Sequence, residues 1–398
     1  MLTTPRFAGL RAALAITAAC TLALSSAAAA TAAPAAHPQA SARRACAVPA
    51  HPGIMSCLVL IRAAVQQHPQ TFFGQHAPTG DGYGPADLKS AYKLPAGSAG
   101  AGQTVAVIDA YDDPNAAADL ATYRSAWGQA ACNTTTGAGC LTKVNQNGAA
   151  SPLPKAAGST GWATEESTDV DMVSAVCPKC HILLVETKAA TAADLGTGVN
   201  SAVTLGAGYV ANSYGSSETS GELSDDTLYY KHPGVAVVAA GGDSGTGASY
   251  PAASQYVTSA GGTTLTKTAA TPRGWTETPW GSGACSAYEP KPSWQKAYTT
   301  GCGAKRSDND VAAVGDPTTG VAVYDTYDQS GWLEVGGTSV SCPIITGVYA
   351  LAGPPAAGTY PASYPYADPA GLFDLSPTSN PYDPPVGLGS PDGTSAFS

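Results

Sequence analysis

Short apolar runs alternate with helical patterns along most of the chain, and this alternation restricts its fold more than any other feature. Runs of strand length without polar alternation are typical of strands buried on both faces. When helices separate such strands, the strands lie parallel and the helices cover the sheet. The alternation therefore predicts an α/β fold, a parallel sheet with helices on both faces. The runs are QTVAVIDA (103–110), HILLVET (181–187), GYVANS (208–213) and VAVVAAGG (235–242).

Helical patterns fill the intervals between these runs. They cover residues 115–127, 165–176 and 192–205. No linker-like change of composition interrupts residues 81–398, so one domain fits the pattern better than two.

The first residues have the form of a secretory signal. Arg6 and Arg11 precede an apolar run that ends in small residues suited to cleavage. We assign residues 1–34 to a signal peptide and residues 35–80 to a short pro-segment or N-terminal extension without a core of its own. No later run is long and apolar enough to span a membrane. The sequence thus predicts a secreted, extracellular protein.

Export allows the cysteines to form disulfides. Cys20 leaves with the signal peptide, and Cys342 is left without a partner at short range. The apolar helix around Cys342 favours a buried free thiol, with a reactive thiol near Ser339 as the alternative. The spacing of the remaining cysteines predicts the local disulfides Cys46–Cys57, Cys132–Cys140, Cys177–Cys180 and Cys285–Cys302.

Charge is sparse and acidic along the chain. The formal net charge is −10, although only 12% of the residues are charged. This balance argues against a nucleic-acid partner, which would require a basic stripe. The 45 glycines and 31 prolines suit a compact, loop-rich exported protein, which we expect to be a monomer.

The stretch GGTSVSCPIITGVYAL (336–351) presents a serine as nucleophiles are often presented. Ser339 follows a Gly-Gly-Thr turn and precedes an apolar segment of helical spacing, with Pro343 in its expected first turn. The N-terminus of such a helix offers free N–H groups to a developing negative charge. A serine nucleophile also needs a base, yet no histidine lies in a His-Gly-Thr-His context. The histidines are His37, His51, His68, His76, His181 and His232.

Two carboxylates on a predicted helix offer the missing base. The apolar stripe of the segment 165–176 is formed by Met172, Val173 and Val176. Glu165 and Asp169 fall in the middle of that stripe on a helical wheel, whereas Glu166 and Asp171 point to the side or to solvent. Burying two carboxyls one turn apart is costly unless they share a proton, and such a cost usually serves function. The alternative is a partly exposed helix whose acids are all solvated.

Asp243 follows the last apolar run on a glycine-rich turn. In open parallel sheets, sites form just beyond the carboxyl ends of the strands. Asp243 is therefore a candidate site residue, although an aspartate on such a turn is by itself more often an ordinary turn residue than a catalytic one.

Several motifs, in this order along the chain, resemble those of the sedolisins, the serine-carboxyl peptidases. The resemblance extends over almost all of residues 83–398. It implies a subtilisin-like parallel sheet in a single catalytic domain, residues 81–398. The motifs are GWATEESTDVDMVSAVCP, ANSYGSSE, AAGGDSG, GGTSVSCPIITGVYALAG and GLGSPDG.

The resemblance implies a role for each candidate residue. Ser339 matches the nucleophile, and Glu165 matches the general base. Asp169 matches the carboxyl that orients Glu165, and Asp243 matches the donor of the oxyanion hole. Asp109 falls where the family has an acidic residue that extends the network. In the second motif, the residue after the serine is Tyr214, where relatives often have tryptophan.

These residue types suit hydrolysis of peptide bonds in acid. An unperturbed glutamic acid titrates near pH ~4.3, so a carboxylate base works where a histidine is already protonated. Asp243 can donate a hydrogen bond to an oxyanion only while it is protonated. We therefore expect a secreted serine-type endopeptidase that acts on proteins or peptides at acid pH.

The resemblance also implies one calcium ion near the C-terminus. Its ligands would be two carboxylates and three backbone carbonyls, and oxygen ligands suit calcium. The loop that carries them is shorter than in relatives, and prolines replace frequent glycines. Only the short segment before Tyr83 could serve in place of the family's long pro-domain. The implied ligands are Asp374, Leu375, Ser379, Pro381 and Asp383.

Other functions remain open at this point. CPKCH (177–181) matches a haem attachment signal or part of a zinc site, although a small disulfide turn is the simpler interpretation. Asp109, His181 and Ser339 have the chain order of a subtilisin-like triad. A secreted binding protein built on an inactive peptidase scaffold is a third alternative.

Overall fold

The structure is a computed structural model that describes residues 42–49, 51, 53–62, 82–97, 99–131, 141–244, 247–376 and 378–398. These residues belong to one compact unit, Ala40–Ser398. The predicted signal peptide, residues 1–34, and the predicted Cys132–Cys140 disulfide lie outside the described residues.

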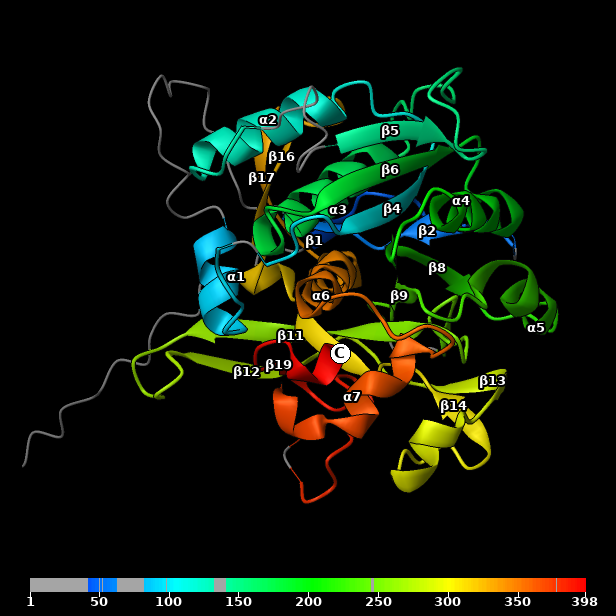
Figure 1. The fold of residues 1–398 in the computed structure, drawn as a ribbon, viewed down its shortest axis with the longest axis vertical. Helices are drawn as coiled ribbons and strands as arrows, with labels where there is room; N and C mark the ends of the chain where they lie inside the picture. The colour runs from blue at the N-terminus through cyan, green and yellow to red at the C-terminus, as the bar shows by residue number, and fades with distance from the viewer. Residues whose placement is uncertain are drawn as a thin grey trace, which may run out of the picture. The chain divides into compact units, whose positions relative to one another are not determined.

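A mostly parallel sheet forms the centre of the fold (Figure 1). Every strand pair in it is parallel except that of β11 and β12, which confirms the predicted sheet. Among the described residues its spatial order is β12 (Trp275–Trp280), β11 (Thr258–Lys267), β9 (Ala236–Ala240), β7 (Tyr209–Asn212), β4 (Thr104–Ala110), β6 (His181–Thr187) and β5 (Leu141–Asn145), and β15 (Val311–Val314) also pairs with β11.

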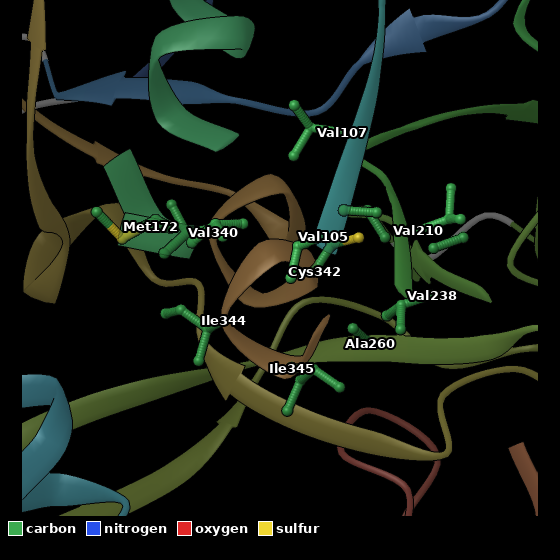
Figure 2. Close-up of a cluster of buried hydrophobic side chains, with 14 of the residues drawn as sticks. Val105, Val107, Met172, Val210, Val238, Ala260, Val340, Cys342, Ile344 and Ile345 are labelled. Carbon is green, nitrogen blue, oxygen red and sulfur yellow. The ribbon is translucent and has the colours of Figure 1, made fainter. Parts of the chain in front are cut away.

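Helices cover both faces of this sheet, as predicted. The longer helices are α2 (Ala116–Ala126), α3 (Trp162–Val176), α4 (Ala192–Thr204) and α6 (Thr338–Ala352). Successive side chains of a strand point to opposite faces. From β4, Ile108 faces α4, where its Cγ2 lies 3.0 Å from a Cβ built on Gly198. Val105 and Val107 instead face the core beside α3 and α6 (Figure 2).

Two helix details differ from the sequence-based expectation. The helix predicted from residue 165 begins at Trp162, directly after Gly161, whose φ of 88° is unfavourable for other residues. The placement of Pro343 in the first turn of its helix was wrong, because α6 begins at Thr338. Proline has no N–H, so the Ser339 carbonyl lacks its usual helical partner four residues on. The Ser213 hydroxyl contacts that carbonyl at 3.5 Å.

Two smaller sheets include the N-terminal segment. Strands β16 and β17 form one of them with β3 and β1, and β8 forms the other with β2 and β10. Residues 42–62 thus pair with the domain along two edges. The strands are β1 (Ala42–Arg44), β2 (Ser56–Cys57), β3 (Leu60–Arg62), β8 (Tyr214–Ser217), β10 (Ser249–Tyr250), β16 (Val321–Asp325) and β17 (Gly331–Gly336).

Short elements complete the described chain. The strand pairs are β13 (Cys285–Pro290) with β14 (Lys305–Ser307), and β18 (Leu372–Phe373) with β19 (Ser390–Pro391). The short helices are α1 (Pro85–Ala91), α5 (Glu222–Asp225), η1 (Asp226–Tyr230), η2 (Ser293–Ala297), η3 (Pro317–Thr319), η4 (Pro361–Ser363), α7 (Tyr364–Ala367), η5 (Pro369–Gly371) and η6 (Ser395–Phe397).

Three of the predicted disulfides are present. They are Cys46–Cys57, Cys177–Cys180 and Cys285–Cys302. Cys342 is a buried free thiol, as expected. The bond between Cys177 and Cys180 removes both thiolates, so the haem and zinc interpretations of CPKCH are wrong. Within the described residues, no helix is long and apolar enough to cross a membrane.

Candidate active site

Ser339 is the second residue of α6 and is buried. The turn before it leaves no room for side chains. A Cβ on Gly336 would lie 2.4 Å from the nitrogen of Pro317, and one on Gly337 would lie 1.9 Å from the oxygen of Leu58. The φ of Gly337 is also positive, at 97°. Both glycines are therefore needed to bring the Ser339 hydroxyl to the end of the sheet.

The Ser339 hydroxyl meets the predicted base. Its Oγ lies 2.9 Å from Oε2 of Glu165, in the first turn of α3, and 3.0 Å from the carbonyl oxygen of Ser213. A hydroxyl has one proton, so it donates to one of these acceptors at a time. Donation to Glu165 is the arrangement that activates a serine.

Asp169 lies one helical turn after Glu165 and is held by Ser213. The Ser213 hydroxyl donates to Oδ1 of Asp169 across 2.6 Å. Oδ2 of Asp169 and Oε1 of Glu165 are buried and have no hydrogen-bond partner among the described residues. Burial and the neighbouring charge of Glu165 raise the pKa of Asp169 well above its usual range. Two such carboxyls can hold one proton between them.

Asp109 lies at the end of β4 and belongs to the same acidic cluster. Neither of its carboxyl oxygens has a hydrogen-bond partner in the described part of the chain. Its pKa is raised well above the usual range by burial, then by the charges of Asp169 and Glu186. Burial, followed by the charge of Asp109, likewise raises the pKa of Glu165. Asp109 thus acts on Glu165 through charge, without a direct hydrogen bond.

The expectation that Glu166 and Asp171 are solvated was wrong, because both are buried. The helical wheel assumed one exposed face, but α3 contacts α2, α6, β4 and β16. Asp171 accepts a hydrogen bond of 2.9 Å from the backbone N–H of Tyr324. Burial, followed by the charge of Glu186, raises the pKa of Glu166 well above its usual range. Glu186 is in turn paired with Lys143 at 2.9 Å.

Asp243 follows β9 and lies against the first residue of α6. Its Oδ1 accepts hydrogen bonds from the backbone N–H of Thr338, at 2.7 Å, and from its hydroxyl, at 2.9 Å. Oδ2 is buried without a partner among the described residues. Burial raises the pKa of Asp243 to about 6, although Thr338 and Arg44 act in the opposite direction. Below that pH the acid has a proton that it can donate from Oδ2.

Tyr214 and His181 take no direct part in these contacts. Tyr214 is buried, donates to Oδ1 of Asn212 at 2.7 Å, and packs beside Trp162.

His181 begins β6 and pairs with Thr104, whereas Asp109 lies five residues further along the neighbouring strand. At about 3.3 Å per residue, His181 is roughly 16 Å from the level of Asp109. The triad of Asp109, His181 and Ser339 is therefore not assembled.

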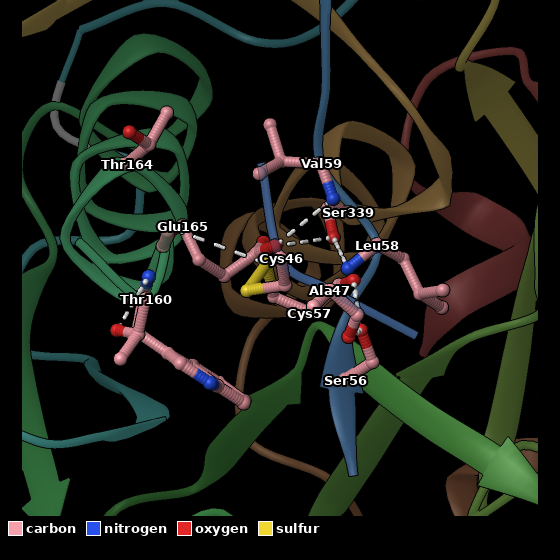
Figure 3. Close-up of a disulfide and its surroundings, with 12 residues drawn as sticks. Cys46, Ala47, Ser56, Cys57, Leu58, Val59, Thr160, Thr164, Glu165 and Ser339 are labelled. Atoms are coloured by element: carbon pink, nitrogen blue, oxygen red, sulfur yellow. Dashed lines mark hydrogen bonds between the residues drawn. A yellow bond between two sulfur atoms is a disulfide. The ribbon is translucent and has the colours of Figure 1, made fainter. Parts of the chain in front are cut away.

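Sequence reasoning missed three contributors to the site. Ser213 and Thr338 lie inside the motifs, next to Tyr214 and Ser339, but no role was assigned to them. Leu58 of the N-terminal segment reaches the site as well, and its N–H lies 3.1 Å from the Ser339 Oγ (Figure 3). Nothing in the local pattern around residue 58 indicated this contact.

A serine bonded to a buried glutamate, with a second acid beside it, is the arrangement that the resemblance to the serine-carboxyl peptidases predicts. The family comparison agrees with the fold, since residues 100–356 match the model Peptidase_S8, the subtilase family. This match covers more than half of the chain. The chain therefore belongs to the subtilase family.

Its curated relatives confirm the resemblance to the sedolisins. Kumamolisin from Bacillus sp. (strain MN-32) is 29% identical over 370 residues, which are 80% of this chain and 63% of kumamolisin. Sedolisin from Pseudomonas sp. (strain 101) is 26% identical over 339 residues, 75% of this chain and 56% of sedolisin. The chain thus spans less than two thirds of the length of either relative.

Solved structures establish the fold independently. Pseudomonas sedolisin, a serine-carboxyl proteinase complexed with two molecules of pseudo-iodotyrostatin, has a TM-score of 0.65 at 23% identity. That similarity covers 79% of this chain and 96% of the sedolisin chain. Sphericase has a TM-score of 0.52 at 16% identity, and the similarity covers 79% of this chain and 99% of the sphericase chain. The fold is subtilisin-like and consists of a single domain.

Proposed function

We propose that the protein is a serine endopeptidase that hydrolyses proteins or peptides at acid pH. Ser339 is the nucleophile, Glu165 the general base, Asp169 its orienting acid and Asp243 the oxyanion donor. The observation that carries this proposal is the 2.9 Å contact between Ser339 Oγ and Glu165 Oε2. The similarity to kumamolisin and sedolisin supports it.

The hydrogen bonds favour Glu165 as the ionised member of the acidic cluster. It accepts two hydrogen bonds, from Ser339 and from the N–H of Val59, and both favour its charged form. Asp169 accepts one hydrogen bond, whereas Asp109 accepts none from the described residues. In acid, Asp109 remains protonated and its charge no longer opposes the ionisation of Glu165, while the hydrogen bonds from Ser339 and Val59 act against the burial that raises its pKa. A single negative charge then lies on the residue that must take the serine proton.

The reaction follows from these positions. Glu165 takes the hydroxyl proton as Ser339 Oγ attacks the substrate carbonyl, and the negative charge moves to the carbonyl oxygen. Neutral Asp243 and the N–H of Ser339, which donates to no other group among the described residues, stabilise that oxygen. Glu165 then gives its proton to the leaving nitrogen, which leaves an ester on Ser339. Water hydrolyses the ester by the same two proton transfers in reverse.

The alternative functions are less well supported. A binding protein on an inactive scaffold would not need the Ser339–Glu165 contact or the buried free oxygens of Asp169 and Asp243. The triad of Asp109, His181 and Ser339 is not assembled, because His181 lies at the opposite end of the strands from Asp109. The acidic mechanism uses the residues that the fold brings together.

Turnover of a denatured protein at acid pH tests the proposal. The chain should degrade it after incubation in acid, and Ser339→Ala should not. Ser341→Ala is a matched control, because Ser341 lies in the same helix and bonds to the N–H of Ala313 instead. Equal turnover by the chain and by Ser339→Ala would refute the proposed function.

One calcium ion bound near the C-terminus remains a proposal. The available oxygens fit such a site, because the carbonyls of Leu375, Ser379 and Pro381 accept no hydrogen bond from the described residues. Oδ1 of Asp374 accepts the N–H of Ser376, which leaves its other oxygen available, and Asp383 is half-buried nearby in sequence. Carboxylate and carbonyl oxygens are the ligands that calcium prefers. The ion would tie this loop together without entering the reaction.

We also propose that the protein is secreted and acts as a monomer. The disulfides support an oxidising environment, and the apolar N-terminus supports export. Mass measurement of the mature protein in the culture medium, with light scattering, would test both statements.

A further inference from the structure

The turn that carries Asp243 contains two glycines, which have no side chains to anchor it. Gly241 and Gly242 follow β9 and directly precede Asp243. Thr338 holds one side of the turn. Its hydroxyl accepts the N–H of Gly242 at 3.1 Å, and its backbone N–H and hydroxyl both donate to Asp243. These contacts tie the turn to the start of α6. Asn309 lies against the turn as well.

Asn309 packs directly against Gly241. Its Oδ1 lies 1.8 Å from the position that a Cβ on Gly241 would occupy, and its Cγ lies 3.0 Å from the same position. Any side chain on Gly241 would therefore collide with the Asn309 amide. Asn309 is fully buried. Its amide thus fills the space beside the turn, and the turn cannot move in that direction.

The amide nitrogen of Asn309 supports the turn a second time, through Ser282. Nδ2 donates to the carbonyl oxygen of Ser282 at 2.6 Å, and the Ser282 hydroxyl lies 3.4 Å from the carbonyl oxygen of Gly242. Oδ1 of Asn309 accepts the hydroxyl of Ser259 at 3.2 Å. A carbonyl oxygen only accepts and an amide N–H only donates, so these partners fix the orientation of the amide.

The same amide also reaches the C-terminal part of the chain. Nδ2 lies 3.0 Å from the carbonyl oxygen of Pro384 and 3.3 Å from that of Pro385. The carbonyl oxygen of Asn309 accepts the hydroxyl of Tyr382 at 2.8 Å. An amide has two N–H groups, so Nδ2 shares them among the carbonyl oxygens around it. Asn309 therefore joins the C-terminal loop to the turn before Asp243.

The backbone at this position restricts which residue can make these contacts. Asn309 lies between β14 and β15 and has a φ of 62°, in the left-handed region. Asparagine adopts this conformation more readily than most residues other than glycine. Glycine has no side chain to donate from. Asparagine thus combines tolerance of the backbone conformation with the N–H donor that the surrounding carbonyl oxygens require.

We propose that Asn309 is a positioning residue that sets the place of the oxyanion donor Asp243, through Gly241 and Ser282. The inference rests on the proposed peptidase function. An oxyanion donor must lie about 2.7–3.1 Å from the oxygen that becomes charged in the transition state. A turn that is free to shift by about 1 Å would keep the fold and still lose this contact. Asn309 itself neither touches the substrate nor transfers a proton.

Asn309→Gly removes the side chain without backbone strain, because glycine also tolerates a φ of 62°. In acid, the kcat of the full chain toward a peptide substrate should fall about 10-fold or more. KM should change little, because the donor acts only in the transition state. Asn309→Asp keeps the shape and, while protonated, one donated hydrogen bond, so it should retain more of kcat than Asn309→Gly.

Asn200→Ala is the matched control for the loss of an amide. The Asn200 amide also donates to a carbonyl oxygen, that of Leu228 at 2.9 Å, but from α4. Its kcat should equal that of the unmodified chain. A near-normal kcat in Asn309→Gly, or the same loss in Asn200→Ala, would overturn the inference.

A double variant separates the positioning of Asp243 from a general structural role. If Asn309 acts through Asp243, Asn309→Gly should cause little further loss of kcat in a chain that already carries Asp243→Ala. A purely structural role would lower kcat by the same factor in both chains. Equal factors would therefore refute the positioning role.

Hydrogen exchange tests the same link without relying on activity. In Asn309→Gly, the backbone N–H groups of Gly242 and Thr338 should exchange faster, because the turn has lost its support. Exchange in β6 should stay unchanged, and uniformly faster exchange would contradict a local role. If the unmodified chain lacks turnover while exchange at the turn responds, the peptidase function is refuted and the link between Asn309 and Asp243 is supported. Turnover by the unmodified chain with unchanged exchange in Asn309→Gly would overturn the inference alone.

Discussion

Ser213 connects the two ends of the active site, because its hydroxyl donates to Asp169 at 2.6 Å while its carbonyl oxygen lies 3.0 Å from Ser339 Oγ. One residue thus fixes the orienting acid and the nucleophile relative to each other. Ser213 is the single residue between β7, a strand of the central sheet, and β8, which pairs with the N-terminal segment.

Ser213→Ala should therefore weaken both stability and catalysis. It leaves Oδ1 of Asp169 without its buried donor, a loss of about 1–3 kcal/mol in the free energy of unfolding. We expect kcat to fall about 10-fold in the folded variant, because Asp169 no longer has a fixed orientation. Urea unfolding and an acid protease assay would measure the two effects. Among the described residues, the Ser216 hydroxyl contacts the carbonyl oxygen of Ser217, so Ser216→Ala should change neither quantity. Equal losses in both variants would show that Ser213 does not orient Asp169 for catalysis.

Glu165→Gln should abolish most activity while the protein stays folded. Glutamine keeps the size of the side chain but cannot take the proton of Ser339, and general-base catalysis contributes about 10²- to 10⁴-fold to the rate. His181→Asn is the control, because His181 lies at the far end of β6. Measured kcat values should show loss only in the first variant. Loss of activity in folded His181→Asn would instead favour a histidine triad.

Asp243 should determine the alkaline limit of activity. Its pKa is raised to about 6 by burial, so it is a neutral donor below that pH and a repelling carboxylate above it. Asp243→Ala should lower kcat by about 10²- to 10³-fold, the usual effect of losing one oxyanion donor. Asp243→Asn retains a donor at every pH, so it should keep some turnover and weaken the fall in rate above about pH 6. A near-normal kcat in Asp243→Ala would exclude this residue from the mechanism.

Stability should decrease as pH rises, because the buried acids have raised pKa values. The folded protein keeps protons that the unfolded chain releases, so the stabilising effect is fully present below the ordinary carboxyl pKa of ~4. It is lost as pH rises through the folded values, which reach about 7 for Asp113 and about 8 for Glu186. Thermal unfolding should therefore give a lower Tm at pH 8 than at pH 4.

Asp109→Asn provides the matched variant for this pH dependence. The substitution removes a buried carboxyl group that has no hydrogen-bond partner among the described residues. Burial raises the pKa of this carboxyl group well above its usual range. The Tm of the variant should fall less between pH 4 and pH 8. A Tm that rises over this range in the unmodified chain would show that the cluster is ionised when folded.

Removal of calcium should lower stability if the proposed C-terminal ligands bind it. A ligand at 100 times its Kd stabilises the folded state by about 2.7 kcal/mol, so a chelator should reduce the Tm measurably. Asp374→Asn and Asp383→Asn should reduce both the Tm and its response to the chelator. Asp392→Asn, which loses only a surface pair with Lys93, should respond as the unmodified chain does. An unchanged Tm in chelator would argue against the site.

Much of the fold and the central residues of the site could be predicted from local sequence. Buried parallel strands and their helices leave a periodic pattern, which is why β6 was predicted at residues 181–187 and observed there. Ser339 and Asp243 lie on glycine-rich turns, and Glu165 lies on an apolar helix stripe. Each of these signals is contained within a few residues of chain.

The pairing of these motifs across the fold depends on tertiary structure. A helical wheel treats one face of α3 as exposed, so it could not show that Glu166 and Asp171 are enclosed by elements distant in sequence. The contact between Leu58 and Ser339 joins residues 281 positions apart and leaves no periodic pattern in either segment. Sequence alone therefore determined which chemical groups the chain carries and on which elements. Only the folded chain decided which of them meet, because burial and contact depend on every layer packed around them.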